Sequence, residues 1–145
     1  MKLKQISVFL ENKPGSVSLP CKALADAGIN IVTLTLADTK DFGILRLITK
    51  DWEKAYDVLK SAKFAVSLSD VVALEVDNTP GGLSGVLDIL NRNGINTEYL
   101  YASVFGVHNR AVLLFRFDDP DEAVRKISAE SGIHIVGPEL FFSLK

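Results

Sequence analysis

The sequence predicts an α+β fold made of two tandem βαββαβ units, with a short extra strand at the C-terminal end. Two observations lead to this prediction. A short turn motif and a glycine-containing corner both recur at an offset of 66 residues, and strand-like and helix-like hydrophobic patterns follow in the same order in each copy. The length of 145 residues, which alone favours one domain, is therefore divided into units 1–69 and 70–145.

The repeat is defined by two short motifs. An acidic-Asn-x-Pro-Gly turn occurs at residues 11–15 and again at 77–81, and a Gly-Ile-Asn corner occurs at 28–30 and again at 94–96. Nine aligned positions are identical over the segment that contains both motifs. From the third strand onward the offset becomes 68, so the second copy has two extra residues in its hairpin, where insertions are tolerated.

Each copy begins with a strand and a helix. Residues 3–10 and 72–76 place apolar side chains at every second position, which is typical of a half-buried strand. Each Pro-Gly turn leads into a helix with an apolar row at spacing i, i+4, i+7. The row consists of Val17, Cys21 and Leu24 in the first copy and of Leu83, Leu87 and Leu90 in the second. Gly28 and Gly94 are predicted to end these helices in the left-handed conformation.

A hairpin, a second helix and a closing strand complete each copy. The hairpin strands are predicted at 29–37 with 43–49 in the first copy, and at 95–105 with 111–117 in the second. The closing strands are predicted at 64–68 and 133–136, which gives the split βαβ, or ferredoxin-like, order.

The second helices start at aspartates. Asp51 precedes the first, and Asp119 precedes the second together with a proline at the first helical position, Pro120. After the second copy, Leu140-Phe141-Phe142 lies where a third copy would begin. We predict an extra strand there, which would cover a sheet edge or pair with a second chain.

Composition excludes several classes of function. Sixteen basic and eighteen acidic residues give a net charge of −2, and the basic residues are scattered, so no nucleic-acid-binding surface is expected. The single cysteine, Cys21, cannot form an internal disulfide or a zinc motif, and a reducing cytoplasm is expected. His108 and His134 have no metal-ligand spacing, and no apolar run is long enough for a membrane span. No cofactor, metal or catalytic arrangement is predicted.

The repeated turn has the chemistry of a carboxylate site. A Pro-Gly turn that leads into a helix presents free backbone N–H groups and the positive end of the helix dipole. Asn12 or Asn78, just before it, carries both a donor and an acceptor and suits the polar groups of a small zwitterion. A purely structural role for the same residues, stabilising the turn and starting the helix, is the alternative.

Together, the doubled turn and Gly-Ile-Asn corner resemble the ACT domain, a small regulatory module of βαββαβ fold, and the resemblance covers essentially the whole chain as two copies. It implies that an amino acid binds between paired domains, against the turn of one and near the Gly-x-Asn of its neighbour. Serine-sensing members have a histidine two residues before the turn asparagine, where this sequence has Leu10 or Val76. The resemblance therefore does not single out serine.

The candidate ligand-binding residues comprise the two turns and the two corner asparagines. They are Asn12, Lys13, Pro14, Gly15, Ser16 and Asn30 in the first copy, and Asn78, Pro80, Gly81, Gly82, Leu83 and Asn96 in the second. The two sites are expected to be unequal. Copy one has Lys13 and, at Pro20, a helix residue without a backbone donor, whereas copy two has two adjacent glycines that would let a ligand approach the backbone closely.

These features predict a stand-alone amino-acid-binding regulatory protein that is not an enzyme. The ligand would be a small amino acid or similar metabolite, and occupancy would be passed in trans to a regulated enzyme or to the assembly of a homodimer. Two alternatives stay open. One is a structural dimerisation module without a ligand, and the other is a small ferredoxin-like enzyme.

Overall fold

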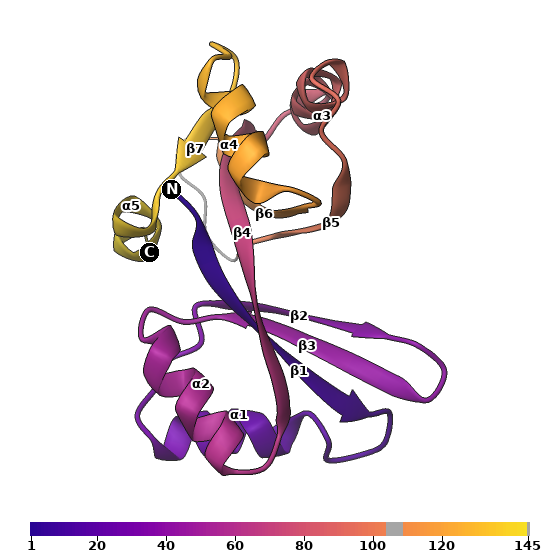
Figure 1. Cartoon of the computed structure of the whole chain (residues 1–145), viewed down its shortest axis with the longest axis vertical. Coiled ribbons are helices and arrows are strands. Elements are labelled where there is room, and N and C mark those ends of the chain that lie inside the picture. Colours follow the sequence, from indigo (N-terminus) through magenta and orange to yellow (C-terminus); the bar gives the residue numbers. More distant parts are fainter. Residues whose placement is uncertain (104–108, 145) are drawn as a thin grey trace. The chain divides into compact units, whose positions relative to one another are not determined.

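The computed structural model describes residues 1–103 and 109–144, and the chain separates into two compact units. The first unit comprises residues 4–69, and the second comprises residues 70–145 together with residues 1–3. Both units contain a sheet and helices in the predicted βαββαβ order (Figure 1). The α+β prediction of two ferredoxin-like units is confirmed.

In the first unit the strand order is β2-β3-β1-β4, and α1 and α2 lie on the same side of β1, β2 and β3 (Figure 1). Strand β3 pairs antiparallel with both β1 and β2. The elements are β1 (Leu3–Glu11), α1 (Ser18–Asp26), β2 (Thr33–Asp38), β3 (Phe42–Ile48), α2 (Trp52–Ser61) and the first part of β4 (Ala65–Asp77).

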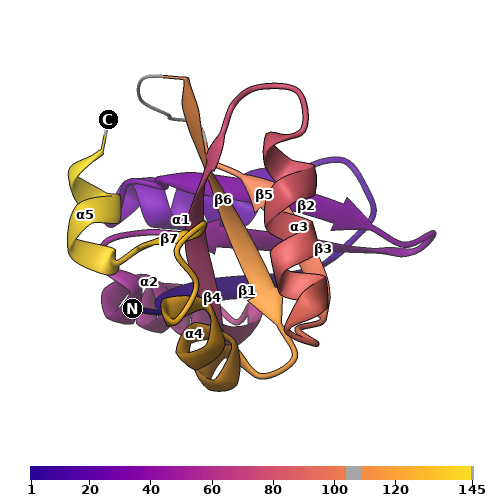
Figure 2. The same cartoon turned by 90° about the horizontal axis from the view of Figure 1, so that it is seen from above.

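In the second unit β4 pairs with both β6 and β7, and β5 pairs with β6, all antiparallel. Figure 2 shows β4 and β6 of this unit with α3 and α4 beside them. Besides β4, the elements are α3 (Gly82–Arg92), β5 (Thr97–Ala102), β6 (Arg110–Phe117), α4 (Pro120–Ser128), β7 (His134–Val136) and α5 (Pro138–Ser143). The predicted end of the hairpin strand at Phe105, and His108, lie outside the described residues.

Each unit has its own hydrophobic core. The apolar face of each helix packs there against the strand residues that face it. In the first unit Leu24 of α1 and Leu59 of α2 are fully buried against β1 and β3. In the second unit Val86 and Leu90 of α3 are buried, whereas Leu83, predicted in this row, is only partly buried at its edge. Of the predicted rows, Leu24 and Leu90 are buried, and the other members pack partly buried against the two cores: Val17, Cys21, Leu83 and Leu87. Val86 is a buried position that the prediction left out.

Glycines end both first helices as predicted. Gly28 and Gly94 have φ of 72° and 67°. After each glycine, an isoleucine N–H donates back to a helix carbonyl, Ile29 to Leu24 O and Ile95 to Leu90 O, both at 2.9 Å. This is the Schellman arrangement, and it turns the chain from the helix toward the next strand at the Gly-Ile-Asn corner.

The predicted C-terminal strand is wrong, because residues 138–143 form helix α5. Pro138 occupies the first helical position, where its fixed φ favours a helix and its missing N–H costs nothing. Phe141 donates its N–H to Gly137 O at 2.9 Å and is fully buried, while Leu140 is half exposed. The aromatic pair therefore anchors a helical turn and does not extend a sheet.

The strands predicted separately at 64–68 and 72–76 form one continuous strand, β4, of 13 residues. No glycine or proline lies within it, so no strand-breaking residue separates the two predicted segments. Its first residues belong to the first unit, and the residues from Asp70 onward belong to the second.

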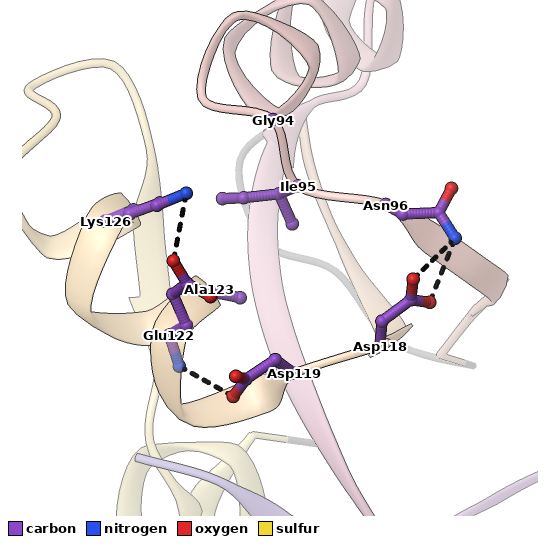
Figure 3. Close-up of a pocket in the computed structure, with 8 residues that line it drawn as sticks. All are labelled: Gly94, Ile95, Asn96, Asp118, Asp119, Glu122, Ala123 and Lys126. Atoms are coloured by element: carbon purple, nitrogen blue, oxygen red, sulfur yellow. Dashed lines mark hydrogen bonds and ion pairs between the residues drawn. The ribbon is translucent and has the colours of Figure 1, made fainter.

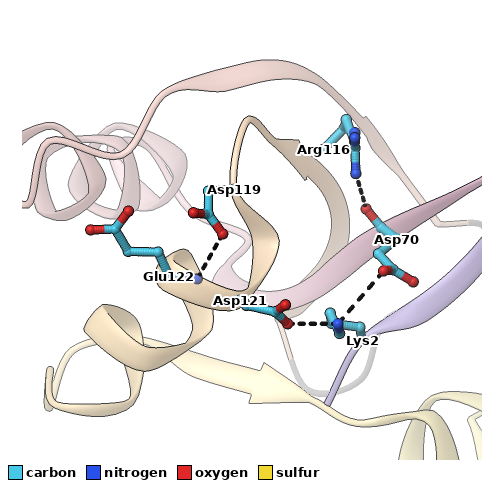
Figure 4. A network of polar contacts seen from close by, with 6 residues as sticks. All are labelled: Lys2, Asp70, Arg116, Asp119, Asp121 and Glu122. Carbon is cyan, nitrogen blue, oxygen red and sulfur yellow. Dashed lines mark hydrogen bonds and ion pairs between the residues drawn. The ribbon is translucent and has the colours of Figure 1, made fainter.

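The N-terminal Lys2 is held within the second unit by two carboxylates (Figure 4). Its Nζ lies 2.6 Å from Asp121 Oδ1 and 3.6 Å from Asp70 Oδ2, and Arg116 donates to the Asp70 carbonyl at 2.9 Å. The hydrogen bond to Asp121, opposed by desolvation and aided by Asp70, raises the pKa of Lys2 above its ordinary value of 10.5. This network fastens the chain start to β4 and α4.

Candidate functional site

The turn of the first unit is fastened to the β2–β3 turn through Asn12. Its backbone N–H donates to Asp41 O at 2.9 Å, and its Nδ2 donates to Lys40 O at 3.3 Å. The side-chain carbonyl of Asn12 remains as an acceptor. Lys13 forms an exposed ion pair with Glu11 at 3.3 Å.

Gly15 and Ser16 complete this turn. Gly15 has a φ of 86°, which only glycine adopts without strain, and a Cβ built there would meet nothing within 4 Å. Ser16 is buried, and its N–H donates to Lys13 O at 3.3 Å. Pro14 is exposed beside Gly15. A ligand could therefore approach the backbone at Gly15, whereas Ser16 is buried.

The turn of the second unit has the same backbone. Gly81 has a φ of 85° and no atom near its Cβ position, as at Gly15. Gly82 differs, because a Cβ there would lie 1.9 Å from the carbonyl oxygen of Asp77. A ligand could thus approach the backbone closely at Gly81. At Gly82, the space that a side chain would occupy is already filled by the end of the preceding strand, β4.

A cavity of about 260 Å³ adjoins the second turn. Arg110 lies in it, 2.7 Å from Glu75 and paired with Asp77 as well. Asn78 and Pro80 are exposed, and the Asn78 N–H donates to Asn109 O at 2.6 Å. The cavity is lined by Gly81, Gly82, Gly85, Val86, Ile89, Gly132, His134 and by residues 75–77 and Arg110.

The two helices that follow the turns start at different aligned positions. Helix α3 starts at Gly82, but α1 starts at Ser18, which is aligned with Ser84. Pro20 explains the delay, since it has no N–H for the carbonyl of Ser16 and would clash with it inside a longer helix. Starting at Ser18 places Pro20 in the first turn, where its N–H is not needed.

Neither helix start has a side-chain cap. In the described part of the chain the N-cap residues of α1 and α3, Val17 and Gly81, make no side-chain cap, whereas Asp119 accepts from Glu122 N at 3.1 Å in α4. In α3 the Gly82 N–H donates to Thr79 O, and helix geometry leaves Leu83 and Ser84 without an intrahelical acceptor. Free N–H groups at a helix start attract an anionic group such as a carboxylate.

A second cavity, of about 210 Å³, lies at the Gly-Ile-Asn corner of the second unit (Figure 3). Asn96 Nδ2 donates to both carboxylate oxygens of Asp118, at 2.9 and 3.1 Å. Lys126 Nζ donates to Asn93 O at 3.0 Å and pairs with Glu122 at 3.2 Å. The side-chain carbonyl of Asn96 remains as an acceptor, and in Figure 3 it points away from Asp118.

Sequence reasoning missed Asp118, Glu122 and Lys126 as neighbours of Asn96. Asp119 was predicted only as the residue before a helix, and it does cap α4. The alignment of the two copies holds a signal for these neighbours. The strand before α4, β6, ends directly beside the Gly-Ile-Asn corner, so the residues that follow it lie near Asn96. In the first unit Asn30 is exposed, and Lys54 donates to Ala27 O at 3.1 Å at the same corner.

Within each unit the turn and the corner are at opposite ends of one helix. Helix α3 has 11 residues, so about 16 Å separates its ends. The structure therefore does not bring Asn78 to Asn96, or Asn12 to Asn30, inside a unit. A small ligand that touches both motifs must take them from two different units.

Other chemistry is limited over the part of the chain that the structure describes. No group of three or more His, Cys, Asp or Glu side chains there is arranged to hold a metal ion. Cys21 is partly buried against the first core. No helix among the described residues is long and apolar enough to cross a membrane.

The family model described as an ACT domain pair matches residues 1–140, nearly the whole chain. The chain belongs to the ACT domain pair family. A search of the curated proteins finds no match.

Among solved structures, this ACT domain pair is similar to protein BT0572 from Bacteroides thetaiotaomicron. The two are 37% identical with a TM-score of 0.89, over 99% of this chain and 98% of that one. The fold is also that of the ligand-free regulatory subunit of aspartate kinase from Thermus thermophilus, at 17% identity and a TM-score of 0.62, over 88% of this chain and 92% of that one. A regulatory subunit of aspartate kinase from Thermus flavus gives 16% and 0.62 over the same shares.

Because the chain is an ACT domain pair, its repeated turn and its repeated corner are equivalent parts of two ACT domains. Both motifs that identified the repeat in the sequence occur in both units of the ACT pair, with the same left-handed glycines. The chain is thus a regulatory module by family, and its turns and corners are the places where its two copies share geometry.

Proposed function

We propose that this ACT domain pair is a non-catalytic sensor of an amino acid, acting in the cytoplasm. The ligand carboxylate would lie at the free N–H groups that follow the Asn-x-Pro-Gly turn, and the ammonium group would meet the corner asparagine of another unit. The family and the similarity in fold to regulatory subunits of aspartate kinase support this proposal.

The observation that carries the proposal is the pair of uncapped helix starts. Both follow a turn asparagine and a left-handed glycine with open space at its Cβ position. A helix start without a side-chain cap leaves N–H groups whose satisfaction by a ligand stabilises the protein. The uncapped start occurs twice in one chain together with the turn asparagine and the left-handed glycine, and this repeated combination supports ligand binding over a turn that is only structural.

Regulation would follow from linkage. A ligand that contacts the turn of one unit and the corner of another stabilises the relative arrangement in which both sets of contacts form. A regulated enzyme that binds this arrangement preferentially would sense ligand occupancy in trans.

The test is a thermal-shift panel of the full chain with the twenty amino acids and common metabolites. A ligand at about 100 times its Kd adds about 2.7 kcal/mol of stability, which raises Tm by roughly 5–10 °C for a protein of this size. A panel in which no compound raises Tm would contradict the proposal and favour a structural dimerisation module.

A further inference from the structure

The cavity beside the second turn lies wholly within the second unit. It is bordered by the end of β4, by the first turns of α3 and by Gly132. The ladder between β4 and β7 ends where His134 lies opposite Glu75, so in the described part of the chain β7 does not pair with residues 76 and 77 of β4. The cavity of about 260 Å³ is located at this end of the ladder.

Gly85 of α3 leaves space beside this cavity. It is one of the lining residues, and a Cβ built at its position would meet no atom within 4 Å. Glycine is unfavourable within a helix, and no neighbouring atom requires it here. The aligned residue of the first unit is Leu19, a large side chain that is 60% exposed. The second copy therefore has room for a ligand group at a position where the first copy has a leucine.

Three charged side chains line the same cavity. Arg110 Nε donates to Glu75 Oε1 at 2.7 Å, and Arg110 Nη1 pairs with Asp77. The Glu75 and Arg110 side chains are only about one third exposed, so water screens their charges incompletely. With His134 counted as neutral, two carboxylates and one guanidinium give the lining a formal charge of −1.

This arrangement favours a cation over an anion as the ligand group. Arg110 already pairs with both carboxylates, which offset its charge. Each carboxylate keeps a second oxygen, and among the described residues no other side chain donates to Glu75 or Asp77. An ammonium or guanidinium group brings the donors and the charge that these oxygens accept, whereas another carboxylate would be repelled by them.

The first copy lacks this chemistry. Phe9 and Phe42 occupy the positions aligned with Glu75 and Arg110, and both are exposed. Together with Leu19 in place of Gly85, they make the corresponding part of the first unit apolar. Recognition of a ligand cation is therefore a property of the second copy.

We propose that the cavity of the second unit selects a basic amino acid, such as lysine, ornithine or arginine. This step rests on the proposed function, which puts the ligand carboxylate at the turn beside the cavity. The side-chain cation then lies at the carboxylates of Glu75 and Asp77. The methylene groups of the ligand pass Gly85 and contact Val86 and Ile89, which also line the cavity.

Isothermal titration of the full chain with matched pairs of ligands tests the charge preference. Arginine and citrulline are similar in size and differ in side-chain charge, and the same holds for lysine and norleucine. We expect the basic member of at least one pair to bind about tenfold or more tightly than its neutral partner, since it makes charge-assisted hydrogen bonds in the cavity.

Three variants test the residues. Glu75→Gln should reduce the preference for the basic ligand about tenfold, because one carboxylate is lost. Glu98→Gln is the matched control, since Glu98 pairs with Arg116 at 3.3 Å in the same unit, outside the cavity, and it should keep the full preference. Gly85→Leu, which gives the second copy the residue of the first, should abolish binding by occupying the cavity. Circular dichroism establishes that the variants fold.

The outcomes separate this inference from the sensor function. If only neutral or acidic amino acids bind, or if the members of each pair bind equally, the basic specificity is wrong while the sensor function stands. An unchanged preference in Glu75→Gln, a lost preference in Glu98→Gln, or full binding by Gly85→Leu would each overturn the cavity assignment. If no amino acid binds but agmatine, which is arginine without its carboxylate, raises Tm of the unmodified chain and not of Glu75→Gln, the sensor function fails and the cation site stands.

Discussion

At the scale of single residues, the clearest constraint is Gly82 at the start of α3. A Cβ there would overlap the Asp77 carbonyl at 1.9 Å, and that oxygen belongs to backbone, which cannot rotate away. Gly85, one turn later in the same helix, has no atom within 4 Å of its Cβ position. Two glycines one turn apart in α3 are therefore under opposite constraints.

We expect Gly82→Ala to destabilise the chain by about 1–3 kcal/mol, because β4 and α3 must move apart. Gly85→Ala should instead stabilise it by about 0.5–1 kcal/mol, since alanine loses less backbone entropy in a helix. Urea unfolding of the two variants measures both changes. Equal effects of the two substitutions would show that Gly82 does not pack as described.

Glu130 is the second informative residue, since it fastens the end of α3 that carries the corner. Asn93 Nδ2 donates to it at 2.8 Å, and Arg92 pairs with it at 3.3 Å. The hydrogen bond from Asn93, opposed by desolvation and aided by the charge of Arg92, lowers the pKa of Glu130 below its ordinary value of 4.5.

A lowered pKa in the folded state means that Glu130 stabilises the fold above pH 4.5 and loses this contribution as pH falls through its folded pKa. Glu130→Gln should therefore make stability less dependent on pH below 4.5, as followed by urea midpoints at several pH values. Glu139→Gln, at an exposed position of α5, is the control. An unchanged acid dependence in the Glu130 variant would contradict the assignment.

At the scale of elements, the copies place aspartates before both second helices but use them differently. Asp119 accepts from Glu122 N at 3.1 Å and precedes Pro120, whereas Asp51 makes no side-chain cap to α2. The Asp51 backbone has φ −97° and ψ 61°, away from the extended conformation of Asp119. The same residue type thus has a capping role in one copy only.

We expect Asp119→Ala to cost about 1 kcal/mol of stability through loss of the cap. Asp51→Ala should cost less, because no capping hydrogen bond is lost. Chemical denaturation of both variants compares how much each helix start contributes to the free energy of unfolding. A larger loss at Asp51 than at Asp119 would reject this account of the helix starts.

At the scale of the whole molecule, the two copies share a fold and differ in chemistry at aligned positions. Phe9 and Phe42 of the first unit are 49% and 61% exposed. Glu75 and Arg110 occupy the aligned positions of the second unit and form an ion pair at 2.7 Å. At these two aligned positions one unit is therefore apolar and the other is charged, and the two ligand sites are expected to have different affinities.

Asn12→Ala and Asn78→Ala should consequently weaken ligand binding to different extents. Isothermal titration with an amino acid found by the thermal-shift panel measures each loss. Asn91→Ala, an exposed asparagine of α3 outside both motifs, is the matched control and should bind as the unmodified chain does. If neither turn variant weakens binding, the assignment of the site to the turns is wrong.

The order of elements in the two copies, and several of their ends, could be predicted from the sequence alone. Gly28 and Gly94 could be placed as helix ends because only glycine adopts their backbone conformation cheaply, and Asp119-Pro120 specifies a helix start by its own geometry. The repeat then required the same βαββαβ order twice. These features depend on residues close together in the chain.

Tertiary structure decided the rest. Residues 138–143 form a helix that starts at Pro138 and buries Phe141, and the pattern of Leu140 to Phe142 by itself did not reveal that burial. Asp118 joined the corner because Asn96, 22 residues earlier, lies within hydrogen-bond distance of it. Gly82 is needed because Asp77 occupies its side-chain space. Such contacts depend on how strands and helices pack. Packing brings together residues that are far apart in the sequence, so no short segment predicts their contact.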